Sequence, residues 1–232
     1  MDRLWRDAEA AYRAEILASL QAMPSARLLD VGCEDGAWTD AVRTRLGIAP
    51  QQVSGLEIEP RLAERARGRG FDVKSGDADG RWPFDDAAFD VVHANQVIEH
   101  MRRLDHFLLE LRRVLAPGGI AVVCTENLAS WHNVGALVLG FQPFSLTNIS
   151  GLRSIGNPFA AHADHVQAGE SFQHTYVLAF SALKDLFGAH GFAIDHAWGS
   201  GYHPLPRALA RVAARLDARH AHFIGIVASV PR

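Results

Sequence analysis

The chain has 232 residues, which is enough for one enlarged domain or for one domain with an insertion. Its apolar content of 48% can fill a core, and its net charge of −3 excludes the basic footprint of a nucleic-acid-binding protein. We expect no membrane span and no signal peptide in this sequence, and therefore a cytoplasmic protein.

Residues 2–21 are predicted to form an amphipathic helix, because apolar side chains recur there at helical spacing. The positions are Leu4, Ala8, Tyr12, Ile16 and Leu20. Pro24 lies just beyond the end, as is common after a helix. We expect this helix to pack on a sheet.

Residues 27–39 read RLLDVGCEDGAWT and predict a strand, a glycine turn and a helix. The apolar run of residues 28–31 is the strand, Gly32 and Gly36 bracket the turn, and a helical pattern follows to Leu46. This is the opening unit of a doubly wound nucleotide-binding sheet. A turn with no ligand is the alternative interpretation.

The chemistry of the turn favours one ligand. A dinucleotide fingerprint has a glycine against the pyrophosphate, whereas this turn has Glu34 there, flanked by Asp30 and Asp35. Three carboxylates would repel a pyrophosphate. S-adenosylmethionine (SAM) carries a sulfonium and an ammonium group instead, which suit an acidic turn.

The stretch resembles motif I of class I SAM-dependent methyltransferases, D-x-G-x-G-x-G, with Glu34 in place of the middle glycine. The resemblance is strong over roughly residues 25–125. It implies that the turn binds the cofactor. The residues concerned are Asp30, Gly32, Cys33 and Gly36.

A second strand is predicted at residues 53–57, before a helix that starts at Pro60. Glu57 ends this strand, where an acidic side chain can accept hydrogen bonds from ribose hydroxyls, with Ile58 beside it. A charge at a helix start is the alternative. After a short third strand at residues 71–74, Asp77 and Ala78 match the place that the family uses for adenine. Turn chemistry alone would also explain Asp77.

The fourth predicted strand, residues 89–94, suits the centre of a sheet. Asn95 and Gln96 follow it and should lie over the ligand crevice, and Glu99 and His100 match an E-H pair of the family. A helix is predicted over residues 104–115. Pro117-Gly118-Gly119 should end it, before a fifth strand at residues 120–124.

Residues 126–175 interrupt the alternation of strands and helices. A long irregular connection is usually a binding loop or disordered, and we expect a lid over the substrate. Within it, residues 134–141 could line an apolar pocket or a homodimer contact, or simply pack in the lid. His162, Asp164 and His165 could hold a metal, but we interpret them as surface residues and predict no metal site.

The alternation then resumes. Ser181 is expected to cap a helix that ends at Gly191, and residues 192–198 should form the sixth strand. A helix follows over residues 204–218, with a last strand at residues 223–230. The apolar positions of that helix are Leu205, Leu209, Val212 and Leu216.

The alternation predicts one α/β domain, residues 1–232, with a Rossmann-like, doubly wound sheet of seven strands. The resemblance implies the order 3-2-1-4-5-7-6, with the last strand antiparallel. It also implies methyl transfer from SAM to a small-molecule acceptor. Twelve histidines favour a hydroxyl acceptor, since histidine is the natural base near neutral pH. The candidate bases are His100, His132, His165 and His174.

Other functions stay open at this point. An N- or C-methyltransferase would use the same cofactor. A SAM-binding regulatory or partner subunit without turnover is a different class, which the unusual Glu34 supports. A nicotinamide oxidoreductase is the third class, and Glu34 opposes it.

Overall fold

The computed structural model describes residues 2–150, 152–160 and 173–232, with the side chains from residue 6 onward. Its centre is a seven-stranded sheet in the order β3-β2-β1-β4-β5-β7-β6. The strands are β1 (Leu28–Val31), β2 (Val53–Glu57), β3 (Asp72–Ser75), β4 (Phe89–Asn95), β5 (Leu115–Glu126), β6 (Ala193–Ser200) and β7 (Phe223–Ser229). β7 is antiparallel to both of its neighbours, and the other strand pairs are parallel. The predicted order and the antiparallel last strand are confirmed.

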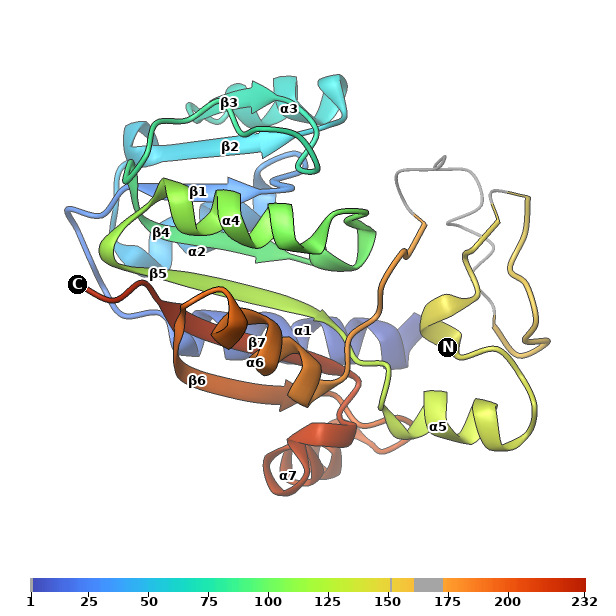
Figure 1. Ribbon diagram of the computed structural model, residues 1–232. Coiled ribbons are helices and arrows are strands. Elements are labelled where there is room, and N and C mark those ends of the chain that lie inside the picture. Colours follow the sequence, from blue (N-terminus) through green and yellow to red (C-terminus); the bar gives the residue numbers. More distant parts are fainter. Residues whose placement is uncertain (1, 151, 161–172) are drawn as a thin grey trace.

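Helices cover both faces of the sheet (Figure 1). They are α1 (Asp2–Ser19), α2 (Ala37–Leu46), α3 (Pro60–Arg67), α4 (Leu104–Val114), α5 (Trp131–Val138), α6 (Phe180–Ala189) and α7 (Arg207–Leu216). One core contains the apolar side chains of α4 and α6, and the other contains those of α1, α2 and α3. Neighbouring residues of a strand point into the two different cores, since strand side chains alternate between the faces of a sheet. Leu28 belongs to the core that contains α1, and Leu29 belongs to the core that contains α4.

The stretch around Pro117-Gly118-Gly119 differs from the prediction. α4 ends at Val114 and the chain enters β5 directly at Leu115, so the glycines lie inside the fifth strand and do not end the helix. They form a bulge: Leu115 pairs with Phe89, whereas Ile120 pairs with Val91. The residue before a proline avoids helical angles, which explains why the helix stops earlier.

Two helices of the C-terminal part also differ from expectation. α6 begins at Phe180 with Ala179 at its cap position, so Ser181 lies inside the helix. α7 packs on the protein through Ala210 and Ala214. The large apolar side chains predicted for this helix are exposed: Leu205, Leu209, Val212 and Leu216.

The predicted lid, as far as it is described, holds α5 and a short 3-10 helix, Phe144–Leu146. It lies beyond the carboxyl ends of the central strands (Figure 1). Leu137, Val138 and Leu139 at the end of α5 are exposed. Within the described part of the chain, no helix is long and apolar enough to cross a membrane.

Candidate functional site

The glycine turn after β1 has a left-handed backbone at three positions. Gly32 and Gly36 have φ values of 70° and 77°, and a Cβ atom on Gly32 would lie 2.6 Å from Val97. Glu34 takes φ 48° although it is not a glycine. Glu34 therefore adopts a backbone conformation that a glycine would adopt freely.

Asp30 lies beneath this turn. It is 2% exposed, one carboxylate oxygen accepts a 2.5 Å hydrogen bond from Thr39, and the other lies 2.7 Å from Nδ1 of His93. The Trp38 indole donates to Nε2 of the same imidazole, so Nδ1 carries the proton. Asp30 thus anchors the turn from below. The Cys33 side chain is also buried, and burial raises the pKa of its thiol.

Glu57 joins two segments at the end of β2. The residue is 5% exposed, and its carboxylate accepts backbone N–H bonds from Glu34 and Glu59, both at 2.9 Å. The next residue in the chain, Ile58, is 51% exposed. Each carboxylate oxygen can accept a second hydrogen bond, so Glu57 can serve the turn and a ligand together.

The negative charge at the turn is partly compensated. Asp35 forms an ion pair with Arg65 at 3.0 Å. The pKa of Glu34 is raised, first by partial burial and then by the charge of Glu57, while Arg13 of α1 lowers it. The Arg13 guanidinium lies over the Trp38 ring at 5.0 Å. The first helix therefore reaches the turn as well as packing on the sheet.

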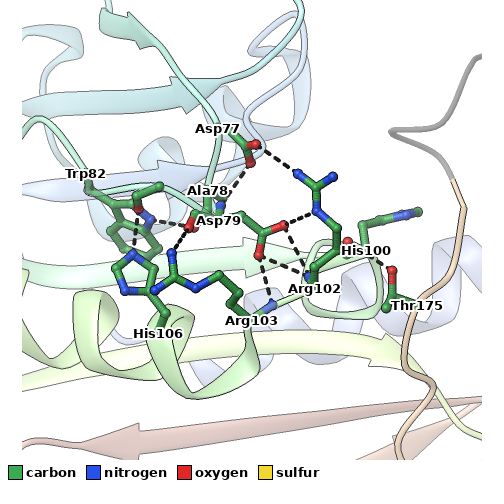
Figure 2. Close-up of polar contacts among 10 residues, drawn as sticks. Asp77, Ala78, Asp79, Trp82, His100, Arg102, Arg103, His106 and Thr175 are labelled. Carbon is green, nitrogen blue, oxygen red and sulfur yellow. Dashed lines mark hydrogen bonds and ion pairs between the residues drawn. The ribbon is translucent and has the colours of Figure 1, made fainter.

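The loop after β3 is tied to the segment after β4 (Figure 2). The buried carboxylate of Asp79 accepts backbone N–H bonds from Arg102 and Arg103, each at 3.0 Å, and a 3.1 Å bond from the Arg102 guanidinium. Asp77 is exposed and accepts the backbone N–H of Asp79, and Ala78 accepts the Trp82 indole N–H through its carbonyl. Asp79 was missed in the sequence, where it looks like one more turn residue.

At the end of β4, Gln96 has φ 56° and its backbone N–H donates to the Cys124 carbonyl at 2.8 Å. The neighbouring Asn95 is half-buried, and its Oδ1 has no hydrogen-bond partner among the described residues. Burial raises the pKa of Tyr12, and a hydrogen bond with Asn95 partly offsets this effect. α1 therefore also covers this strand end.

Three side chains that could bind a metal ion or accept a proton meet next to this strand end. One ligand atom each from Glu99, His100 and His174 lies within 4.8 Å of the others, and the two imidazole rings are 4.9 Å apart. The returning lid segment is fixed there by its backbone, since the N–H groups of Thr175 and Tyr176 donate to the Glu99 carbonyl at 2.7 and 3.2 Å. We call these three residues the EHH cluster.

The carboxyl group of Glu99 is 1% exposed, and burial raises its pKa to about 7. Thr125 at the end of β5 donates to its Oε2 at 2.8 Å, while Oε1 has no hydrogen-bond partner among the described residues. Glu126 brings a second buried carboxylate, 3.8 Å from Nδ1 of His174. Sequence reasoning found Glu99 only as a family match and missed Glu126, which has no motif around it.

The structure thus places the predicted bases in two different groups. His100 and His174 meet in the EHH cluster, whereas His132 contacts His203 and His222, with ring centres 5.7 and 4.4 Å away. His165, like His162 and Asp164, lies outside the described residues.

Comparison with known proteins gives one family. The profile of the family described as "Methyltransferase domain" matches residues 4–197. A probable S-adenosylmethionine-dependent methyltransferase of Mycolicibacterium smegmatis is 29% identical over 207 residues, which are 88% of this chain and 63% of that protein. A 24-methylenesterol C-methyltransferase of Oryza sativa subsp. japonica is 34% identical over 127 residues, which are 52% of this chain and 34% of that protein.

Among solved structures, the complex of the Haloferax volcanii Trm112 methyltransferase activator with a putative methyltransferase is similar, with a TM-score of 0.64 and 20% identity. The match covers 100% of this chain and 92% of that one, and at this identity it concerns the fold. The chain spans from about a third to under two thirds of the length of the two curated relatives above.

Proposed function

Since this chain belongs to the Methyltransferase domain family, we propose that it transfers a methyl group from SAM to a hydroxyl of a small-molecule acceptor. One observation carries the choice of acceptor: proton-accepting groups of the EHH cluster meet at the carboxyl ends of β4 and β5. That edge of a doubly wound sheet is where ligands bind.

In this proposal the amino acid end of SAM lies on the turn from Gly32 to Gly36. The orphaned Oδ1 of Asn95 would accept from its ammonium group, with Gln96 beside it. A Cβ atom would lie 2.6 Å from Val97 at Gly32 and 3.0 Å from Phe71 at Gly36, so the two glycines let the turn pack closely on the protein. An acidic turn suits a cofactor that carries positive charge and no phosphate.

The other end of SAM would lie across β2 and β3. The ribose hydroxyls would donate to the Glu57 carboxylate, which is already oriented by two backbone amides. The exposed apolar side chain of Ile58 offers a surface for the adenine ring. Asp77 and Ala78 would lie near the adenine amino group.

The sulfonium of SAM makes its methyl group a strong electrophile, so the chain's own residues mainly align the acceptor and exclude water. The acceptor oxygen attacks the methyl carbon, the carbon–sulfur bond breaks toward sulfur, and S-adenosylhomocysteine leaves as a neutral thioether. A hydroxyl must lose its proton for this attack. The EHH cluster activates that hydroxyl, and the described part of the lid, residues 126–150, 152–160 and 173–175, covers the acceptor.

The test measures SAM binding and turnover separately. Wild-type protein, His100→Ala, His174→Ala and the control His196→Ala are titrated with SAM in a calorimeter and then assayed for S-adenosylhomocysteine with a panel of phenols, catechols and aliphatic alcohols. His196 is exposed on the edge strand β6. The two cluster variants should keep SAM affinity and lose roughly 10²–10⁴-fold in rate. Normal turnover by both would refute hydroxyl activation at the cluster.

C-methylation is the second candidate, favoured by the name of the rice relative, a sterol C-methyltransferase. It would use the same SAM site and a base that removes a proton from carbon. Mass spectrometry of the product separates the two, because a methyl ether and a new carbon–carbon bond fragment differently. An N-methyltransferase would instead form S-adenosylhomocysteine with amine acceptors. A regulatory subunit without turnover would bind SAM but form no S-adenosylhomocysteine with any acceptor.

A further inference from the structure

We propose that Glu99, His100 and His174 bind a divalent transition-metal ion. The role of this ion in activating the acceptor rests on the proposed function, but its binding does not. Two imidazoles and one carboxylate form a ligand set that suits zinc, manganese and ferrous iron.

The separation of the ligand atoms fits one ion. Atoms bound to a common ion at about 2.0–2.2 Å lie at most roughly 4.4 Å apart. The candidate atoms of the EHH cluster lie within 4.8 Å of one another. Three ligands of a tetrahedral ion lie closer still, at roughly 3.4 Å from one another, so the side chains would draw together by about 1 Å when the ion binds.

The hydrogen bonds of the two histidines fix the tautomer that a metal requires. Nδ1 of His100 lies 3.1 Å from the Gln173 carbonyl, and Nδ1 of His174 lies 2.6 Å from the Ser145 carbonyl. A carbonyl can only accept, so each Nδ1 carries the proton and each Nε2 carries the lone pair. Ligating histidines commonly donate their other N–H to a carbonyl in this way.

The carboxylates supply the negative charge that such an ion neutralises. The Thr125 hydroxyl orients Glu99 through Oε2, which leaves the buried Oε1 without a hydrogen-bond partner among the described residues. Oε2 of Glu126 is a second buried oxygen of this kind. A buried carboxylate oxygen without a hydrogen bond is costly, and a cation bound to Oε1 of Glu99 would remove that cost.

An ion with three protein ligands keeps positions open for substrate. An acceptor hydroxyl bound there would be acidified and would release its proton to water at neutral pH. The two histidines would then position the ion and would not themselves take the proton.

The experiment uses the full chain, freed of any affinity tag and stripped with a chelator. Zinc and manganese ions, each alone, are titrated into wild type, Glu99→Gln, His174→Gln and the control His196→Ala in a calorimeter, and manganese binding is checked by electron paramagnetic resonance. We expect one site in wild type and in the control, and a loss of at least roughly 10-fold in affinity in both cluster variants. Circular dichroism verifies that the variants are folded.

The outcomes distinguish the two proposals. Absence of metal binding by wild type, or equal binding by both cluster variants, would overturn the metal site. Turnover by the stripped wild type that metal does not stimulate would overturn the ion's role and leave methyl transfer intact. Metal binding without any S-adenosylhomocysteine formation would support the site and count against the proposed function.

Discussion

Replacing Glu57 with glutamine is expected to weaken SAM binding and to loosen the glycine turn at the same time. The carboxylate accepts the backbone N–H groups of Glu34 and Glu59, both at 2.9 Å, and the residue is 5% exposed. Glutamine has the same shape but only one oxygen. One of the two backbone donors must therefore face the NH₂ group, which cannot accept.

The size of both effects follows from these contacts. A buried donor left without an acceptor costs about 1–3 kcal/mol. In a protein of this length, that corresponds to a fall of roughly 2–12 °C in Tm. The lost hydrogen bond from the ribose to a charged acceptor would cost a further 1.5–3 kcal/mol or so of binding free energy. SAM affinity should then fall by roughly 10–150-fold.

Calorimetric titration with SAM and thermal unfolding of the same samples measure the two effects. Glu59→Gln is the matched control, because the one hydrogen bond of that side chain within the described part of the chain is a long 3.4 Å bond from the backbone N–H of Arg61 at the start of α3. It should change SAM affinity by less than about 2-fold. A folded Glu57→Gln variant with wild-type affinity, or an equal loss in the control, would refute the placement of the ribose.

Three further results are expected. Gly32→Ala should lower Tm by several degrees, since φ 70° is strained for alanine and its Cβ would lie 2.6 Å from Val97, and adding Val97→Ala should restore part of the loss, as thermal unfolding would show. The pKa of the Glu110 carboxyl group is lowered chiefly by its hydrogen bond with Arg113. The stabilisation of the fold by this carboxylate is therefore complete above pH 4.5, the ordinary pKa of the group, and is lost as the pH falls through the lower pKa of the folded protein. Urea unfolding from pH 7 to pH 3 should therefore show that Glu110→Gln is destabilising at neutral pH and that this difference shrinks in acid; a constant difference would contradict it. NAD should not bind in the calorimeter, because Glu34 occupies the place of its pyrophosphate, and micromolar affinity would disprove the cofactor choice.

The sequence was most informative where function depends on local backbone. Gly32 and Glu57 sit at the ends of two strands that the sequence pattern predicts, and Gly36 precedes the helix that follows the first of them. The structure brings the turn and Glu57 together at the carboxyl ends of these strands. Asp30 shows the limit of this reasoning. The resemblance implied that Asp30 binds the cofactor, which stays a prediction, and only the folded protein shows that its carboxylate contacts Thr39 and His93 beneath the turn.

The EHH cluster could be predicted only in part. His100 follows a predicted strand, so its position at the end of the sheet could be predicted. His174 is 74 positions further along the chain, and backbone hydrogen bonds from Thr175 and Tyr176 to Glu99 hold it near His100. Such bonds have no sequence signature. The sequence also could not show that His132 lies against His222 while His174 lies against His100, although both residues belong to the predicted lid.

The place of β7 in the sheet sets an order of assembly. β7 follows β6 in the chain but lies between β5 and β6, so β6 has no sheet neighbour until β7 has been synthesised. Up to that moment the edge of β5 presents unpaired backbone groups beside Val122 and Val123, which is a hazard for association between nascent chains. β6 and β7 can pair with each other first and then join β5 as a two-strand unit. The growing chain therefore closes its sheet late, in a step that a ribosome-bound intermediate lacking β7 could not complete.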